Sequence, residues 1–117
     1  MSCSDFAWEV KNGDLEKVKE AVEKGINVND AIDGRLPVCL ASDYGQLDVL
    51  NFLLSSGADV EVTDKFGVSP LLAAIFEGHT KCVQSLLQAG ARKDGKAPDG
   101  SSYLDNAEKD EIKALLR

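Results

Sequence analysis

Three cysteines and one histidine are the side chains in this sequence best suited to nucleophilic, redox or metal chemistry. The cysteines, Cys3, Cys39 and Cys82, are odd in number and form no C-x-x-C pair, which argues against a disulfide framework or a zinc site. A Ser–His or Cys–His catalytic pair would require His79, the single histidine. We therefore predict a non-enzymatic protein with no catalytic residue, no cofactor and no metal. A redox or catalytic use of Cys39 or Cys82 with His79 is the alternative that thiol reactivity would test.

The elements that must position these residues follow from a repeat of glycines. Three series recur at intervals of 32 or 33 residues: Gly13, Gly45 and Gly78; Gly25, Gly57 and Gly90; and Gly34, Gly67 and Gly100. Such a period is typical of repeat proteins, in which each short unit buries its apolar face only by stacking on its neighbours. Cys39 and Cys82 fall at core-type helical positions of the repeat, so we expect both thiols to be buried and reduced.

Each repeat is predicted to contain a turn, a short helix, a tight turn at glycine, a longer helix and a loop. Pro37 and Pro70 suit the first turn of the short helix, because the N–H that proline lacks would have no partner there. Ser69 is able to cap one of these helices, whereas Leu36 at the matching place is not. The predicted fold class is an all-α solenoid with two full central repeats and partial capping repeats at its N- and C-terminal ends.

The two ends and the first loop depart from the repeat. Lys17 and Glu20 stand where the second repeat has apolar residues, which gives the first repeat the polar outer face that an end needs. The last unit is shorter by about one helical turn. The loop from Gly25 to Gly34 is one residue shorter than the two later loops.

The charge balance of the chain indicates the class of partner. Its 117 residues carry 20 acidic and 13 basic side chains, a net charge of −7. Such a charge repels nucleic acid and anionic membranes and suits a basic protein surface. The chain has no apolar stretch of the ~20 residues that span a bilayer and no signal-peptide pattern at its N-terminus. We expect a monomer in the cytoplasm, with the nucleus as a second compartment.

The repeated phrases resemble the ankyrin repeat, whose units contain G-x-T-P-L-H-x-A-A and end in L-L-x-x-G-A-D. Two full copies cover residues 33–64 and 65–97, with partial copies at 1–32 and 98–117, so the resemblance implies a single ankyrin-repeat domain over residues 1–117. His79 occupies a glycine–histidine position that this repeat uses structurally. Cys39 and Leu72 replace its usual histidine, so the hydrogen bonds of that histidine are expected to be absent.

In ankyrin proteins the first helices and the loop tips form a concave binding surface. The equivalent helix positions here are Trp8, Lys11, Asn12, Leu40, Asp43, Tyr44, Ala73, Phe76 and Glu77. Three of the seven aromatic residues of the chain, Trp8, Tyr44 and Phe76, belong to this set and are predicted interface anchors. The alternative for Trp8 is that it closes the N-terminal edge of the core.

A closer resemblance, from Lys11-Asn12-Gly13-Asp14-Leu15 to Ile112-Lys113-Ala114-Leu115-Leu116, is to a family of small stand-alone ankyrin proteins. It implies binding to the heterodimeric actin-capping protein, which is kept from filament barbed ends so that filaments grow. The alternative is an ankyrin adaptor or inhibitor of another basic partner, such as a Rel-type transcription factor. The partner-binding residues that the resemblance implies are Trp8, Asp43, Tyr44, Asp30, Asp33, Asp64, Phe76 and Glu77.

Overall fold

The computed structural model describes residues 3–32 and 34–117, apart from the side chains of Cys3 and Ser4. Helices follow one another in pairs along this part of the chain. Their bounds are α1 Cys3–Asn12, α2 Leu15–Glu23, α3 Pro37–Asp43, α4 Leu47–Ser55, α5 Pro70–Glu77, α6 Thr80–Gln88, α7 Tyr103–Asn106 and α8 Asp110–Leu116.

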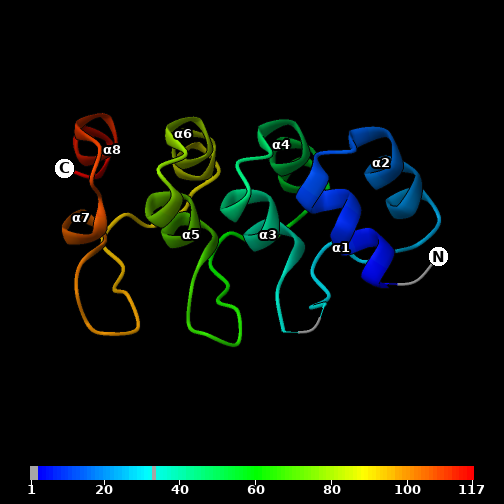
Figure 1. Ribbon diagram of the computed structural model, residues 1–117, viewed down its shortest axis with the longest axis horizontal. Coiled ribbons are helices and arrows are strands. Elements are labelled where there is room, and N and C mark those ends of the chain that lie inside the picture. Colours follow the sequence, from blue (N-terminus) through cyan, green and yellow to red (C-terminus); the bar gives the residue numbers. More distant parts are fainter. Residues whose placement is uncertain (1–2, 33) are drawn as a thin grey trace.

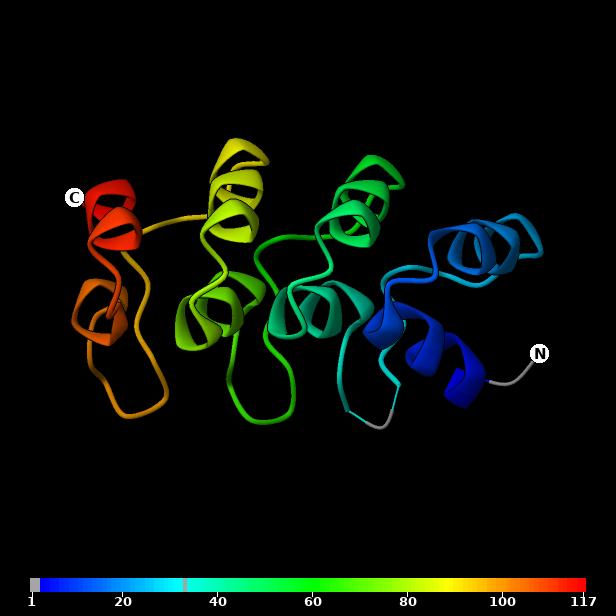
Figure 2. The same ribbon diagram turned by 45° about the horizontal axis from the view of Figure 1, so that its top comes forward.

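The helix pairs stack side by side into an elongated array with extents of 40 × 24 × 21 Å. The first helices of the pairs, α1, α3, α5 and α7, form one row, and the second helices, α2, α4, α6 and α8, form another (Figure 1). Long loops extend from the side of the first-helix row, and the tilted view in Figure 2 shows the same two rows. The all-α ankyrin-type solenoid predicted from the sequence is confirmed.

The first helices of the two central pairs are almost wholly buried. Every residue of α3 from Pro37 to Ser42 and of α5 from Pro70 to Ile75 is buried, because each helix has a neighbouring repeat on both sides and a second helix behind it. The second helices bury one stripe only, exemplified by Leu50 and Leu53 in α4, both 0% exposed. One continuous core therefore joins the repeats, as stacking of short units requires.

The turn between the two helices of a pair is held by the next repeat. Gly13, Gly45 and Gly78 all have positive φ, which favours glycine. A β-carbon at Gly45 would lie 2.6 Å from His79 Cε1, and one at Gly13 would meet the side chain of Gln46. The recurring glycine therefore has two physical reasons, backbone conformation and close approach by the following repeat.

Side chains at the start of the second helices make hydrogen bonds to the preceding repeat. In each case a side-chain nitrogen lies within hydrogen-bond distance of a backbone carbonyl at the end of the preceding first helix, and we call this series the inter-repeat clasps. They are Gln46 Nε2 to Lys11 O at 2.8 Å, His79 Nε2 to Asp43 O at 3.1 Å, and Lys109 Nζ to Gly78 O at 2.7 Å. His79 serves as a donor here when its proton is on Nε2.

The helix ends follow the sequence prediction. The Ser69 side chain accepts a hydrogen bond from the Leu72 amide at 3.1 Å, whereas Leu36 makes no side-chain cap. Gly57 and Gly90 follow their helices with φ of 95° and 101°, as glycines after a helix C-terminus do. The thiol of Cys39 lies 3.8 Å from the Val68 carbonyl, so this replacement for histidine keeps one weak polar contact that the sequence did not predict.

The first loop is one residue shorter than the later loops, and the difference is in the turn at its tip. Ile32 and Arg35 exchange two backbone hydrogen bonds there, three positions apart. In the second loop the Asp64 amide donates to the carbonyl of Val68, four positions on. The first loop thus closes with one residue fewer, and its Asp33 lies outside the described residues.

The array ends as expected for terminal repeats. Lys17 and Glu20 are exposed on α2. At the other end α7 has four residues against the eight of α5, while Ile112 and Leu116 of α8 are buried. No helix in residues 3–32 or 34–117 combines the length and apolarity needed to cross a membrane. The predicted domain limits of 1–117 and the unit boundaries after residues 32, 64 and 97 remain predictions.

Candidate protein-binding face

Three exposed aromatic side chains stand on the row of first helices. Trp8 of α1 is 62% exposed, and Tyr44, which ends α3, and Phe76 of α5 are each 50% exposed. Large apolar side chains at this exposure are unusual for core residues and typical of binding surfaces. Trp8 therefore does not close the edge of the core. We call the surface of Trp8, Tyr44, Phe76 and the residues beside them the first-helix face.

Not every sequence position assigned to this face is available to a partner. Leu40 and Ala73, which share the helix register of Trp8, are buried at 3% and 1% exposure. Each central first helix has a neighbour on both sides, so this register position points into the core, whereas α1 has no preceding repeat to cover Trp8. The face is consequently made by the last residues of α3 and α5 and by α1.

Acidic side chains flank the aromatic ones. Glu77 follows Phe76 and is exposed, and Asp30 is exposed in the first loop. Asp43 precedes Tyr44 and is partly exposed, with its Oδ2 3.8 Å from Nη2 of Arg35. The Nζ of Lys11 lies 5.8 Å from the centre of the Tyr44 ring, so the face joins the first and second repeats.

Asp64, one of the predicted contacts, is a structural residue instead. Its side chain is 1% exposed, and its Oδ1 accepts hydrogen bonds from the amides of Phe66 at 2.8 Å and Val68 at 3.1 Å. Its Oδ2 lies 2.8 Å from Nε of Arg35, whose N–H is poorly aligned with it, so this contact is an ion pair rather than a hydrogen bond. Because one oxygen is used within the loop and the other pairs with Arg35 of the preceding repeat, we remove Asp64 from the candidate contacts.

The spacing in the sequence contained a signal for this structural role. Asp64 stands three residues before Gly67, where a short acidic side chain closes a turn by accepting backbone N–H groups. Phe66 lies at the tip of the second loop, where the sequence prediction placed part of the binding surface, and it is 61% exposed. The Nζ of Lys65 lies 5.3 Å from the centre of its ring. Phe66 extends the apolar part of the candidate surface from the helices to the loop.

The cysteines and the histidine are engaged in packing. Burial, with a smaller effect of the nearby Asp64 carboxylate, raises the pKa of Cys39 to about 12, and burial also raises the pKa of Cys82. Both thiols therefore stay protonated at neutral pH, which makes them poor nucleophiles. His79 is part of an inter-repeat clasp. Within the described residues, no three His, Cys, Asp or Glu side chains come together as metal ligands would.

Stacked helix pairs, a continuous core and an exposed aromatic and acidic face define a protein-binding repeat module. Comparisons with known proteins agree. The family described as ankyrin repeats (3 copies) matches residues 6–99 and 46–115. Myotrophin of Xenopus tropicalis is 50% identical over 117 residues, with 99% of each chain covered, and myotrophin of Rattus norvegicus is 48% identical over 118 residues, with 100% of each covered.

A third relative shows how the same repeat occurs in a larger protein. Dauer abnormal formation protein 25 of Caenorhabditis elegans is 37% identical over 73 residues, which cover 61% of this chain and 19% of that protein. The similarity to the two myotrophins differs from this partial match because it covers nearly the full length of both compared chains. The chain belongs to the myotrophin family of ankyrin-repeat proteins.

Proposed function

We propose that this protein binds the heterodimeric actin-capping protein through the first-helix face and blocks its capping of filament barbed ends, so promoting filament growth. The observation that supports this most is the row of exposed Trp8, Tyr44 and Phe76 beside the acidic Asp43 and Glu77. Membership of the myotrophin family supports a protein partner, and the resemblance drawn from the sequence implies that this partner is capping protein. The proposed compartment is the cytoplasm, with the nucleus as a second one.

The proposed mechanism is competition for a basic surface. The resemblance implies that the chain covers basic residues through which capping protein would contact actin, and an acidic, aromatic face on a chain of charge −7 is complementary to such a surface. Aromatic side chains supply apolar area at the centre of an interface, while charges at its rim govern the rate of encounter. A capping protein occupied in this way has no basic surface left for actin.

The test measures elongation of actin filaments from seeds in the presence of capping protein, with increasing amounts of the purified chain. Wild type is expected to restore elongation, and Trp8→Ala combined with Asp43→Arg is expected to lose the effect. A matched control is Asp48→Arg, which makes the same charge reversal at an exposed position of α4, on the second-helix row. Failure of wild type at high micromolar concentration, or equal loss in the control, would refute the proposal.

The same preparation addresses the alternative partner. A Rel-type transcription factor, or another basic protein, would be retained by the immobilised chain at low salt and released as the salt concentration rises. If such a protein is retained and capping protein is not, the alternative replaces the proposal. Retention of capping protein that depends on Trp8 supports the proposal.

A further inference from the structure

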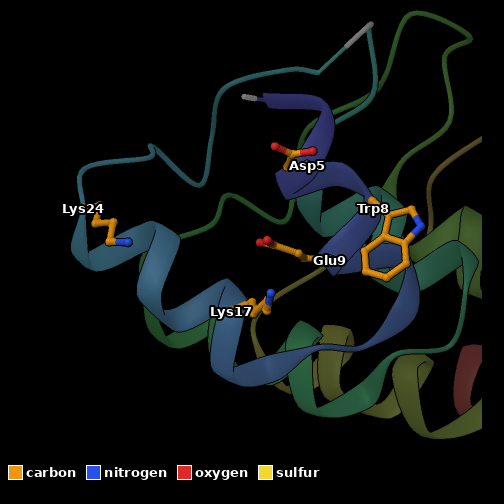
Figure 3. Close-up of a pocket in the computed structure, with 5 residues that line it drawn as sticks. All are labelled: Asp5, Trp8, Glu9, Lys17 and Lys24. Carbon is orange, nitrogen blue, oxygen red and sulfur yellow. The ribbon is translucent and has the colours of Figure 1, made fainter. Parts of the chain in front are cut away.

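A hollow at the N-terminal end of the array lies beside Trp8, and its other lining residues have no role in the contacts assigned so far. Its volume is about 540 Å³, and it is lined by Asp5, Trp8 and Glu9 of α1 and by Lys17 and Lys24 at α2. Figure 3 shows the Glu9 carboxylate extending from α1 toward α2, with Asp5 and Lys17 on either side of it. Among the described residues no repeat lies before α1, so this side of the helix pair is open.

Glu9 is the unusual member of this group. It is only 5% exposed, and its Oε2 is buried without a hydrogen-bond partner among the described residues. A buried carboxylate oxygen without a donor is costly, since it has lost water and gained no hydrogen bond in return. The corresponding position of α3 is Ala41, a small apolar residue. Neither core packing nor the repeat pattern explains an acid here.

The unpartnered oxygen of Glu9 favours a cationic ligand, in a lining that holds two acidic and two basic side chains. Asp5 and Glu9 are four residues apart on α1, so two negative charges share one helix side. Lys17 and Lys24 are both exposed, so water screens their ammonium groups while Glu9 stays shielded. The two carboxylates are too few for a metal ion among the described residues, which contain no group of three candidate ligands. A side chain that brings several N–H donors fits better.

We propose that this hollow receives one arginine side chain of the partner protein. A guanidinium presents a planar fork of N–H donors, which suits two carboxylates better than the single ammonium of lysine. The hollow adjoins Trp8, so it is continuous with the first-helix face and extends the proposed interface around the end of the array. The identity of the partner rests on the proposed function, whereas the arginine site itself does not.

The site is tested first without any partner, because the single tryptophan of the chain, Trp8, lines the hollow and reports on it by fluorescence. N-acetyl-arginine amide is titrated into the full chain and compared with N-acetyl-citrulline amide, which has nearly the same shape and no charge. We expect a saturable change with the arginine compound only. Glu9→Gln should weaken it about tenfold, the factor that corresponds to about 1.4 kcal/mol. The matched control Glu16→Gln, exposed on α2 and outside the hollow, should leave it unchanged.

Two results would overturn the arginine site. Equal responses to the arginine and citrulline compounds would show that charge is not recognised. A wild type that does not respond, together with loss of stability in Lys17→Met, would show that Glu9 pairs with Lys17 inside the protein. Thermal unfolding of every variant, followed by circular dichroism, establishes that each is folded.

The role of the site in the complex is then tested with capping protein. Glu9→Gln is expected to weaken capping-protein binding about tenfold, mainly through faster dissociation, while Glu16→Gln has no effect. Arginine binding that depends on Glu9 with unchanged capping-protein affinity would overturn the assignment of the site to this partner. Absence of any capping-protein binding by wild type would refute the proposed function and leave the arginine titration as the independent result.

Discussion

Replacing Asp64 by alanine is the change that best separates a structural residue from a partner contact. The substitution removes the acceptor for the Phe66 and Val68 amides and the counter-ion of Arg35. A hydrogen bond to a charged group contributes about 1.5–3 kcal/mol, and breaking a buried ion pair costs about 3–5 kcal/mol. These contributions overlap and do not add.

The expected loss of stability is smaller than the separate contributions suggest. The Arg35 side chain is 24% exposed and has Asp43 at 3.8 Å, so it keeps water and a second carboxylate when Asp64 is removed. The amides belong to a surface loop that water reaches once the carboxylate is gone. We therefore expect Asp64→Ala to lower the free energy of unfolding by about 2–4 kcal/mol, and Asp64→Asn, which keeps one acceptor oxygen, by about 1–2 kcal/mol.

The assay is urea denaturation followed by circular dichroism, with Asp30→Ala as the exposed control, expected within about 0.5 kcal/mol of wild type. A double-mutant cycle of Asp64→Asn with Arg35→Gln should give a coupling of about 1 kcal/mol, since the two side chains are in contact. Asp64→Asn, where folded, should inhibit capping within about twofold of wild type. A loss of stability below about 1 kcal/mol combined with loss of inhibition would refute the reasoning and make Asp64 a contact.

Three further changes test other features of the fold. Gly45→Ala should cost about 1–3 kcal/mol more in urea denaturation than Gly57→Ala, because both glycines have positive φ but only Gly45 has the His79 ring within reach of an added β-carbon. Ser69→Ala should cost about 1–2 kcal/mol, since it removes a helix cap and the Ser69 Oγ contact with Tyr103 Oη at 2.7 Å. A loss below about 0.5 kcal/mol would contradict the capping role. Cys39 should react with a thiol reagent only after unfolding, because its pKa is raised to about 12. An unfolded thiol loses its proton near pH 8.5, so the stability that the buried Cys39 thiol contributes is complete below that pH and falls as the pH rises toward 12. Cys39→Ala should remove this contribution to the decrease in the free energy of unfolding between pH 8 and 10. An unchanged pH dependence of the free energy of unfolding would contradict the burial argument.

The fold was predictable from the sequence because its signals repeat. One glycine at a turn is weak, but Gly13, Gly45 and Gly78 at a common interval indicate three equivalent turns, and the structure gives all three a positive φ. Ser69 and Leu36 were correctly separated as capping and non-capping residues, since that difference depends only on local hydrogen bonding. Turns and helix caps could be predicted because they depend on residues within a single repeat.

The candidate face was predictable only in part, because it depends on how the repeats surround each position. The register that exposes Trp8 in α1 buries Leu40 in α3, and this difference comes from the missing neighbour at the end of the array. The role of Asp64 depends on Arg35, which lies one repeat earlier. In the sequence, Glu9 resembles an exposed acidic residue on the surface of a helix. Only its burial in the structure distinguishes it from such a residue. The spacing of residues in the sequence predicts the individual repeats but gives little information on the contacts between them.

The inter-repeat clasps all run in the same direction along the chain, from a later repeat to an earlier one. In each clasp a later residue completes an earlier turn: Gln46 reaches Lys11, His79 reaches Asp43, and Lys109 reaches Gly78. On a ribosome, a helix pair would therefore emerge with its carbonyl still unpaired and would be finished only when the next pair followed. Lys109 would close the turn between α5 and α6, so synthesis and completion of the fold would advance together with a lag of about one repeat.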